Sequence, residues 1–160
     1  MLTLKEAATR AGFNINDPLI DWAVVLTTLS QPGATGGPYT SKHILVENGE
    51  YYCRTTATIG IVGGRPFSLV GEGPIDQNYA SGRGASFIWT KAPSDGGPLM
   101  KIVSPTCRFQ DIAFRGQGSK MVPAASNGIV MLSRSSLRDC WITQLGIALD
   151  GAALLITGDH

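Results

Sequence analysis

Charged side chains are scarce in this chain: they make up 16% of 160 residues, with Lys plus Arg at 13 and Asp plus Glu at 12. A net charge of +1 with scattered charges lacks the basic footprint of a nucleic-acid-binding protein. At 43% hydrophobic residues, the composition also differs from that of disordered chains. We therefore expect one folded unit with its own core and no nucleic-acid partner.

Long apolar runs, histidine and cysteine are also in short supply. No run approaches a transmembrane span, so no membrane insertion is expected. The opening "MLTLKEAATRAGF" has no charged leader followed by an apolar core, so no secretory signal is expected either. His43 and His160 cannot build a zinc site, and no Ser/His/Asp order is apparent. Cys53, Cys107 and Cys140 lack metal or redox spacing and are predicted to be small buried hydrophobes. We expect no metal and no cofactor.

Two helices are predicted at the start of the chain. Thr3 and Glu6 in "TLKE" form a capping box, and the helix that follows should stop at Gly12. Asp17 followed by Pro18 predicts a second helix, with Asp17 as its N-cap. That second helix is apolar on nearly all sides and should be buried. Residues 1–40 are therefore predicted to form a helical cap or attachment segment.

From His43 onward the pattern changes to short β-type runs separated by Gly, Pro, Ser and Asn, of which the chain has many (Gly 20, Pro 9). Such punctuation is typical of strands and turns and predicts an all-β architecture over residues 41–160. The runs are "HILVE", "EYYCRTT", "ATIGIV", "FSLVG", "SFIWT", "LMKIV", "CRFQDIAF", "GIVML", "LRDCWIT", "GIALD" and "ALLIT".

The segment "CRFQDIAFRG" returns 28 residues later as "LRDCWITQ". The matching residues are Phe109, Asp111 and Phe114, which return as Leu137, Asp139 and Ile142. This period lies in the range of solenoids, and only Asn48-Gly49 looks like a two-residue hairpin turn. Both features favour coils that stack in parallel, while a β-sandwich is the alternative.

Three segments together resemble the start of a right-handed parallel β-helix of the pectate-lyase-like superfamily. They are "PLIDWAVVLTTLSQPGATGG", "HILVENGEYYCRTTATI" and "FSLVGEG". Gly49-Glu50-Tyr51 matches the superfamily's glycine-tyrosine turn, and Leu69 to Gly73 matches its "sLvGeG" strand. The fold class implied is all-β: a right-handed parallel β-helix preceded by two short N-terminal α-helices.

Phage tailspikes, tail fibres and depolymerases of this superfamily are similar in style. That resemblance implies a virion protein assembled in the host cytoplasm, a homotrimer, and surface polysaccharide as ligand. The N-terminal helices would attach the chain to other virion proteins. The alternative is the N-terminal part of a polysaccharide lyase or glycoside hydrolase. However, the Asp-Asp, Gly-His-Gly and Arg-x-Lys motifs of those enzymes are missing here.

Glycoside hydrolysis needs two carboxylates near the scissile bond, and the 28-residue echo offers a pair. Strand alternation predicts that Asp111 and Arg115 point outward, and likewise Asp139 and Trp141. In neighbouring coils the two aspartates would lie about 4.8 Å apart, with Trp141 as a stacking surface for a sugar ring. The structural alternative is that both acids are ordinary solvated surface residues, with an arginine near enough to soften their repulsion.

Two further aromatic residues are candidates for sugar binding. Tyr79 and Trp89 lie in "DQNYASGRGASFIW". Trp89 alternates with Ile88, so one of these two side chains should be buried and the other exposed. The predicted substrate-binding set is therefore Trp141, Arg115, Trp89 and Tyr79, and the predicted catalytic pair is Asp111 and Asp139.

Overall fold

In the computed structural model, described residues cover 1–31, 42–60, 66–73, 84–90, 98–104, 107–116, 128–131, 135–143 and 154–156. Within these ranges the chain is mostly β-strand with two helices, which confirms the all-β class. The elements are β1 (Leu2–Thr3), α1 (Leu4–Arg10), α2 (Trp22–Ser30), β2 (Lys42–Val46), β3 (Gly49–Cys53), β4 (Ala57–Ile59), β5 (Phe67–Gly71), β6 (Ala85–Trp89), β7 (Met100–Ile102), β8 (Arg108–Gln110), β9 (Ile112–Arg115), β10 (Ile129–Met131), β11 (Ser136–Arg138), β12 (Trp141–Thr143) and β13 (Leu154–Ile156).

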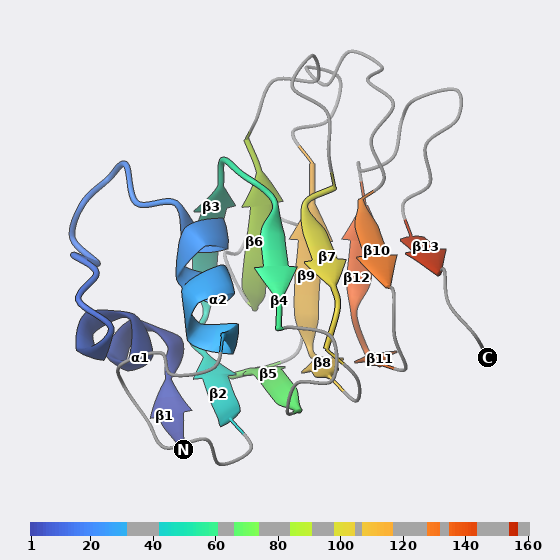
Figure 1. Cartoon of the computed structure of the whole chain (residues 1–160), viewed down its shortest axis with the longest axis horizontal. Helices are drawn as coiled ribbons and strands as arrows, with labels where there is room; N and C mark the ends of the chain where they lie inside the picture. Colours follow the sequence, from blue (N-terminus) through green and yellow to red (C-terminus); the bar gives the residue numbers. More distant parts are fainter. Residues whose placement is uncertain are drawn as a thin grey trace.

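The described strands form three sheets, and every described strand pair is parallel. The first sheet has the order β1-β2-β5-β8-β11, the second β3-β6-β9-β12, and the third β4-β7-β10-β13. From β2 onward, each strand pairs with the strand three places further along the chain. All three sheets grow in the same direction, from the blue N-terminal end to the red C-terminal end (Figure 1).

The hairpin suggested by Asn48-Gly49 does not form. Instead β2 pairs with β5 and β3 pairs with β6, so the two strands that flank Asn48 belong to different sheets. Parallel strands need a long connection before they can pair. The chain therefore visits the other two sheets before it returns to the first.

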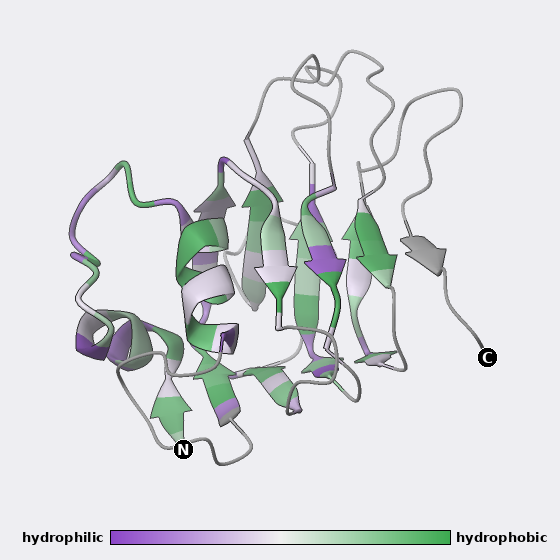
Figure 2. Ribbon diagram, viewed as in Figure 1, coloured by the Kyte–Doolittle hydropathy of each residue, from purple (hydrophilic) through white to green (hydrophobic). Residues whose placement is uncertain are grey.

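The core lies between the inner faces of the three sheets. Apolar residues dominate strands such as β6, β9 and β10 (Figure 2). In the second sheet the inner residues Tyr51, Phe87 and Phe114 are in register, and all three are at most 1% exposed. Their rings form a stack, with centroids 5.3 Å apart for Tyr51–Phe87 and 6.1 Å apart for Phe87–Phe114. Trp22 of α2 extends the stack with an edge-on contact at 4.8 Å to Tyr51.

The capping box that opens α1 is confirmed. Thr3 Oγ1 accepts from the backbone N–H of Glu6 at 3.2 Å, and the Glu6 carboxylate accepts from the N–H of Thr3 at 3.0 Å. Helix α1 ends at Arg10, just before the predicted stop at Gly12.

The predicted start of α2 is wrong. Asp17 only closes a turn, with its carboxylate accepting from the N–H of Leu19, and the helix begins at Trp22 with Asp21 as N-cap. The same Asp21 carboxylate also accepts from the N–H of Arg54 at 2.9 Å and the hydroxyl of Thr55 at 2.7 Å. These contacts after β3 fix the N-cap at Asp21. The expectation of burial on nearly all sides also fails, because Leu19 is 66% and Val24 43% exposed.

Helix α2 covers the edge of the third sheet at β4 (Figure 1). Thr27 Oγ1 accepts from the N–H of Thr58 at 2.9 Å, and Ser30 Oγ accepts from the N–H of Gly60 at 2.9 Å. The Gln31 amide donates to the carbonyl of Gly60 at 3.2 Å. Side chains of the helix thus satisfy backbone groups that the edge strand would otherwise leave unpaired.

Candidate functional site

The outward side of the second sheet carries two rows of side chains in register, which we call the outer face. One row contains Glu50, Ser86, Ala113 and Trp141, and the other contains Tyr52, Ile88 and Arg115. Alternation explains this face, because the residues between these positions point into the core. Neither row is visible as a motif in the sequence, because its members come from four strands that are distant along the chain.

A polar network occupies the middle of the outer face. Arg115 Nη2 donates to Glu50 Oε1 at 2.7 Å although 65 residues separate the two, and the Tyr52 hydroxyl donates to Glu50 Oε2. The Arg115 side chain is only 15% exposed, whereas that of Glu50 is 49% exposed. β6 lies between these two residues in the register, so the arginine side chain must cross it.

This network shifts two pKa values. The hydrogen bond from Tyr52, followed by the hydrogen bond and charge of Arg115, lowers the pKa of Glu50 below its ordinary value. The pKa of Tyr52 is raised, mainly because its hydroxyl donates to Glu50. Glu50 is therefore a charged acceptor at neutral pH, and Tyr52 keeps its proton.

The predicted sugar-binding residues are placed differently from one another. Arg115 lies on the outer face, and half-buried Trp141 lies three strands from Glu50 in the same row. Trp89 points into the core at 2% exposure, and its neighbour Ile88 is also buried at 6%. The expectation that one of these two is exposed fails, and Trp89 offers no stacking surface to a ligand. Tyr79 lies outside the described residues.

The recurring aspartates lie at corners between sheets. The alternation predicts that Asp111 is an outward residue within one strand, but the structure breaks that segment into β8 and β9 at Asp111. Asp139 likewise separates β11 from β12, with Cys140 following it. Their φ angles of +54° and +49° are the only positive values among described non-glycine residues. The aspartates therefore turn the chain from the first sheet into the second.

The choice of aspartate at these corners has a conformational reason. A left-handed backbone crowds Cβ against the following carbonyl, and Asp and Asn tolerate it better than other side chains do. The residue before β6 is Gly84 with a φ of +93°, so glycine meets the same demand one strand earlier. The flanking registers place Asp139 directly after Asp111 in this row of corners, which confirms the 28-residue echo as a structural repeat.

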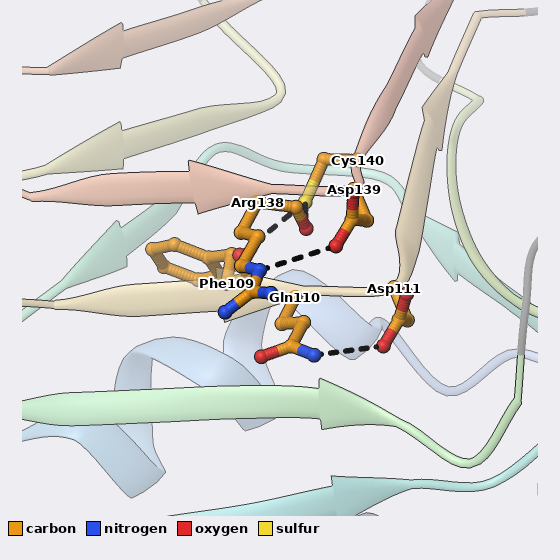
Figure 3. A network of polar contacts seen from close by, with 6 residues as sticks. All are labelled: Phe109, Gln110, Asp111, Arg138, Asp139 and Cys140. Atoms are coloured by element: carbon orange, nitrogen blue, oxygen red, sulfur yellow. Dashed lines mark hydrogen bonds and ion pairs between the residues drawn. The ribbon is translucent and has the colours of Figure 1, made fainter.

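Each corner carboxylate contacts the residue before it (Figure 3). Asp111 Oδ2 accepts from the Gln110 amide at 3.1 Å, and Asp139 Oδ2 accepts from Arg138 Nε at 3.3 Å. The Asp139 side chain is 64% exposed. Between the two corners, the N–H of Asp111 donates to the carbonyl of Arg138 at 3.2 Å. The pair is accessible and adjacent, and its use as acid and nucleophile stays a prediction.

Two more acids occupy the same corner and were missed by sequence reasoning. Glu47 follows β2 and Glu72 follows β5, just as Asp111 follows β8 and Asp139 follows β11. We call these four residues the acidic corner. The Glu72 carboxylate accepts from the N–H of Asn48 at 3.1 Å, which ties the first two levels together. Because Glu47 and Glu72 differ from aspartate and are spaced by 25 residues, the echo did not include them.

Metal and thiol chemistry receive no support from the part of the chain that the structure describes. No group of three or more His, Cys, Asp or Glu side chains there is arranged to hold a metal ion. Cys53 and Cys107 are buried as predicted, Cys140 packs against the core, and burial raises the pKa of all three thiols. Neither described helix has the length and apolar character needed to cross a membrane.

No protein-family model, curated protein or solved structure matches this chain. The outer face and the acidic corner are therefore the features on which a functional proposal depends.

Proposed function

We propose that the chain forms a right-handed parallel β-helix of the pectate-lyase-like kind. Three features support this proposal: the parallel pairing throughout, the recurrence of each sheet after three strands, and the single core between the sheets. Parallel crossovers in one sheet are right-handed in nearly all proteins, which supports the hand. One turn of this coil would contain one strand from each sheet.

The biochemical role proposed is that of a phage virion protein of tailspike or tail-fibre type, a homotrimer that recognises surface carbohydrate. The outer face carries this proposal. It combines a flat parallel sheet, two partly exposed aromatic rings in Tyr52 and Trp141, and the fixed polar network of Glu50 and Arg115. Aromatic rings offer an apolar surface with a polar edge, and sugar sites combine such surfaces with a few placed polar groups.

Glycan binding tests the recognition role. Trp141→Ala and Tyr52→Ala should each weaken binding to the cognate glycan at least tenfold in calorimetry. Lys101→Ala, an exposed residue of β7 in the third sheet, is the matched control and should bind as the parent chain does. Unchanged binding in both aromatic variants would place the site elsewhere.

Oligomeric state and gene context test the virion role. Light scattering after size exclusion should give a trimer at micromolar concentration, and the coding gene should lie among tail or capsid genes. A clean monomer beside metabolic genes would contradict the virion assignment.

A polysaccharide depolymerase is the second candidate, and the adjacent accessible corner carboxylates favour it. Asp139→Asn keeps a residue that tolerates the left-handed backbone and removes the charge. If Asp111 and Asp139 act as acid and nucleophile, each Asp→Asn variant should abolish polysaccharide cleavage while the fold remains intact by circular dichroism. Cleavage at the parent rate would remove the pair from the mechanism.

A further inference from the structure

The described charges around the outer face are mostly negative. The acidic corner contributes one carboxylate per level at the start of the second sheet, and Glu50 adds a fifth on the face itself. Two guanidinium groups lie among them: Arg138 pairs with Asp139 and Arg115 with Glu50. Successive levels of a parallel sheet are about 4.8 Å apart, so neighbouring corner carboxylates lie within one Debye length of about 8 Å at physiological salt.

The centre of the face has a different character from its border. Glu50 and Arg115 cancel each other's charge at 2.7 Å, while half of the Glu50 side chain remains exposed to accept hydrogen bonds from a ligand. A sugar hydroxyl both donates and accepts, so it suits the Glu50 carboxylate and the Tyr52 phenol oxygen. A carboxylate or sulfate group on the ligand would offer only acceptors and would meet the acidic corner.

The two aromatic residues set the length of the ligand. Tyr52 lies on β3 and Trp141 on β12, which are three strand spacings apart in the second sheet, or about 14 Å. A ligand that contacts both rings must extend across the strands over several sugar units, and it runs beside the acidic corner along that whole distance. A polyanion would therefore meet repulsion at every level.

We propose that the outer face binds an uncharged, hydroxyl-rich sugar chain across its four strands and rejects polyanionic glycans. This inference rests on the proposed function as a carbohydrate-recognition module and adds the chemical class of the ligand. Glu50 and Tyr52 contact the hydroxyls, Tyr52 and Trp141 stack on sugar rings, and Arg115 is a positioning residue that holds Glu50. The acidic corner supplies the selection against charge.

A paired glycan experiment tests the selectivity. The whole chain is applied to an array of microbial and plant polysaccharides, in which each uronic-acid polymer is present both as the free acid and after reduction of its carboxyl groups. Retained glycans should be neutral, and a reduced polymer should bind at least tenfold more tightly than its parent acid in low salt. That ratio should shrink in 0.5 M NaCl (about 4 Å Debye length) because the charges are screened.

Variants separate selection from contact. Asp111→Asn combined with Asp139→Asn should narrow the ratio between reduced and acidic polymers while neutral binding persists. Trp141→Ala should weaken both forms equally, and Trp141→Phe should restore part of the affinity if the fold is intact. Arg115→Lys should lower affinity and raise the pKa of Glu50 in a carbon-13 NMR titration.

The outcomes are distinct for the two proposals. Equal or tighter binding of the acidic polymers overturns the selectivity and leaves carbohydrate recognition standing. Neutral binding that survives both Trp141→Ala and Tyr52→Ala overturns the assignment to the outer face. Failure to bind any glycan overturns the proposed function itself and this inference with it.

Discussion

At Asp111 the chain leaves one sheet and enters the next with a φ of +54°, and at Asp139 it does so again with a φ of +49°. The side chains contact Gln110 and Arg138 (Figure 3), but the backbone angle is the stricter requirement. The recurrence of aspartate therefore has a sufficient architectural cause. Any catalytic role for the pair is additional to that cause.

Substitution at Asp111 separates the backbone from the charge. Asp111→Asn should change the free energy of unfolding little, because asparagine also tolerates a left-handed backbone. Asp111→Val should destabilise by about 1–2 kcal/mol because its branched Cβ meets the carbonyl. Urea denaturation measures both. A valine variant as stable as the parent chain would refute the corner explanation.

Gly71 is required by a close approach between levels. A Cβ at this position would lie 2.0 Å from the backbone carbonyl oxygen of Asp111. Gly71→Ala should therefore destabilise by roughly 2 kcal/mol or more, since a backbone shift is needed. Gly73→Ala is the matched control, with its nearest atom at 3.9 Å, and should stay within about 0.5 kcal/mol. Thermal melts of the two variants should differ clearly.

Glu50 gives the outer face an acid-sensitive contact. Its pKa in the folded chain lies below the ordinary value of 4.5. The stabilisation it gives is therefore present above pH 4.5 and lost as pH falls through the lower folded value. Tyr52→Phe removes the largest cause and should raise this pKa in a carbon-13 NMR titration. An unchanged titration curve would show that the hydroxyl contact does not form in solution.

At the scale of elements, α2 acts as a substitute for a missing strand at the edge of the third sheet. Thr27 and Ser30 present hydroxyl oxygens to backbone N–H groups of β4 and the residue after it, Gly60. Such groups would otherwise be available for pairing with another chain. The helix therefore closes this end of the third sheet through side chains rather than a strand.

Thr27→Val tests this covering of the edge. The two side chains are similar in shape, but valine leaves the N–H of Thr58 without its acceptor, which should cost about 1–3 kcal/mol. Thr9→Val is the control, because the Thr9 hydroxyl donates only to the carbonyl of Lys5 on an exposed helix surface. The difference in unfolding midpoint between the two variants is the measurement. Equal midpoints would show that the edge needs no such bond.

Element boundaries followed from sequence where local chemistry decides them. The capping box at Thr3 lies within one turn of helix and was predicted. The start of α2 was not, because contacts of Asp21 with Arg54 and Thr55, more than 30 residues away, decide between Asp17 and Asp21. The strand β1 was missed for a similar reason, since its two residues form a strand only by pairing with β2.

At the scale of the whole molecule, one aromatic stack joins the helical segment to the coils. Trp22, Tyr51, Phe87 and Phe114 contact one another in sequence from α2 to β9. The helices share one hydrophobic core with the strands. The N-terminal segment and the first three levels should therefore unfold as one cooperative unit.

Phe87→Ala tests this coupling. Removal of the central ring should cost about 3–5 kcal/mol, and hydrogen exchange should show the loss equally in α2 and in β9. Tyr52→Ala, an exposed ring on neighbouring β3, should cost far less. If the loss is confined to β6 and β9, the helical cap is an independent unit.

Sequence alone determined the all-β class, ten of the thirteen described strands in outline, the first helix and the 28-residue repeat. These depend on alternation, capping and turn residues, which act over a few positions. Only the tertiary structure decided that Asp111 and Asp139 are corners, that Trp89 is buried, and that Glu50, Tyr52 and Arg115 meet on one face. Register between distant strands creates such contacts, and strand register is a property of the packed sheets rather than of any single segment.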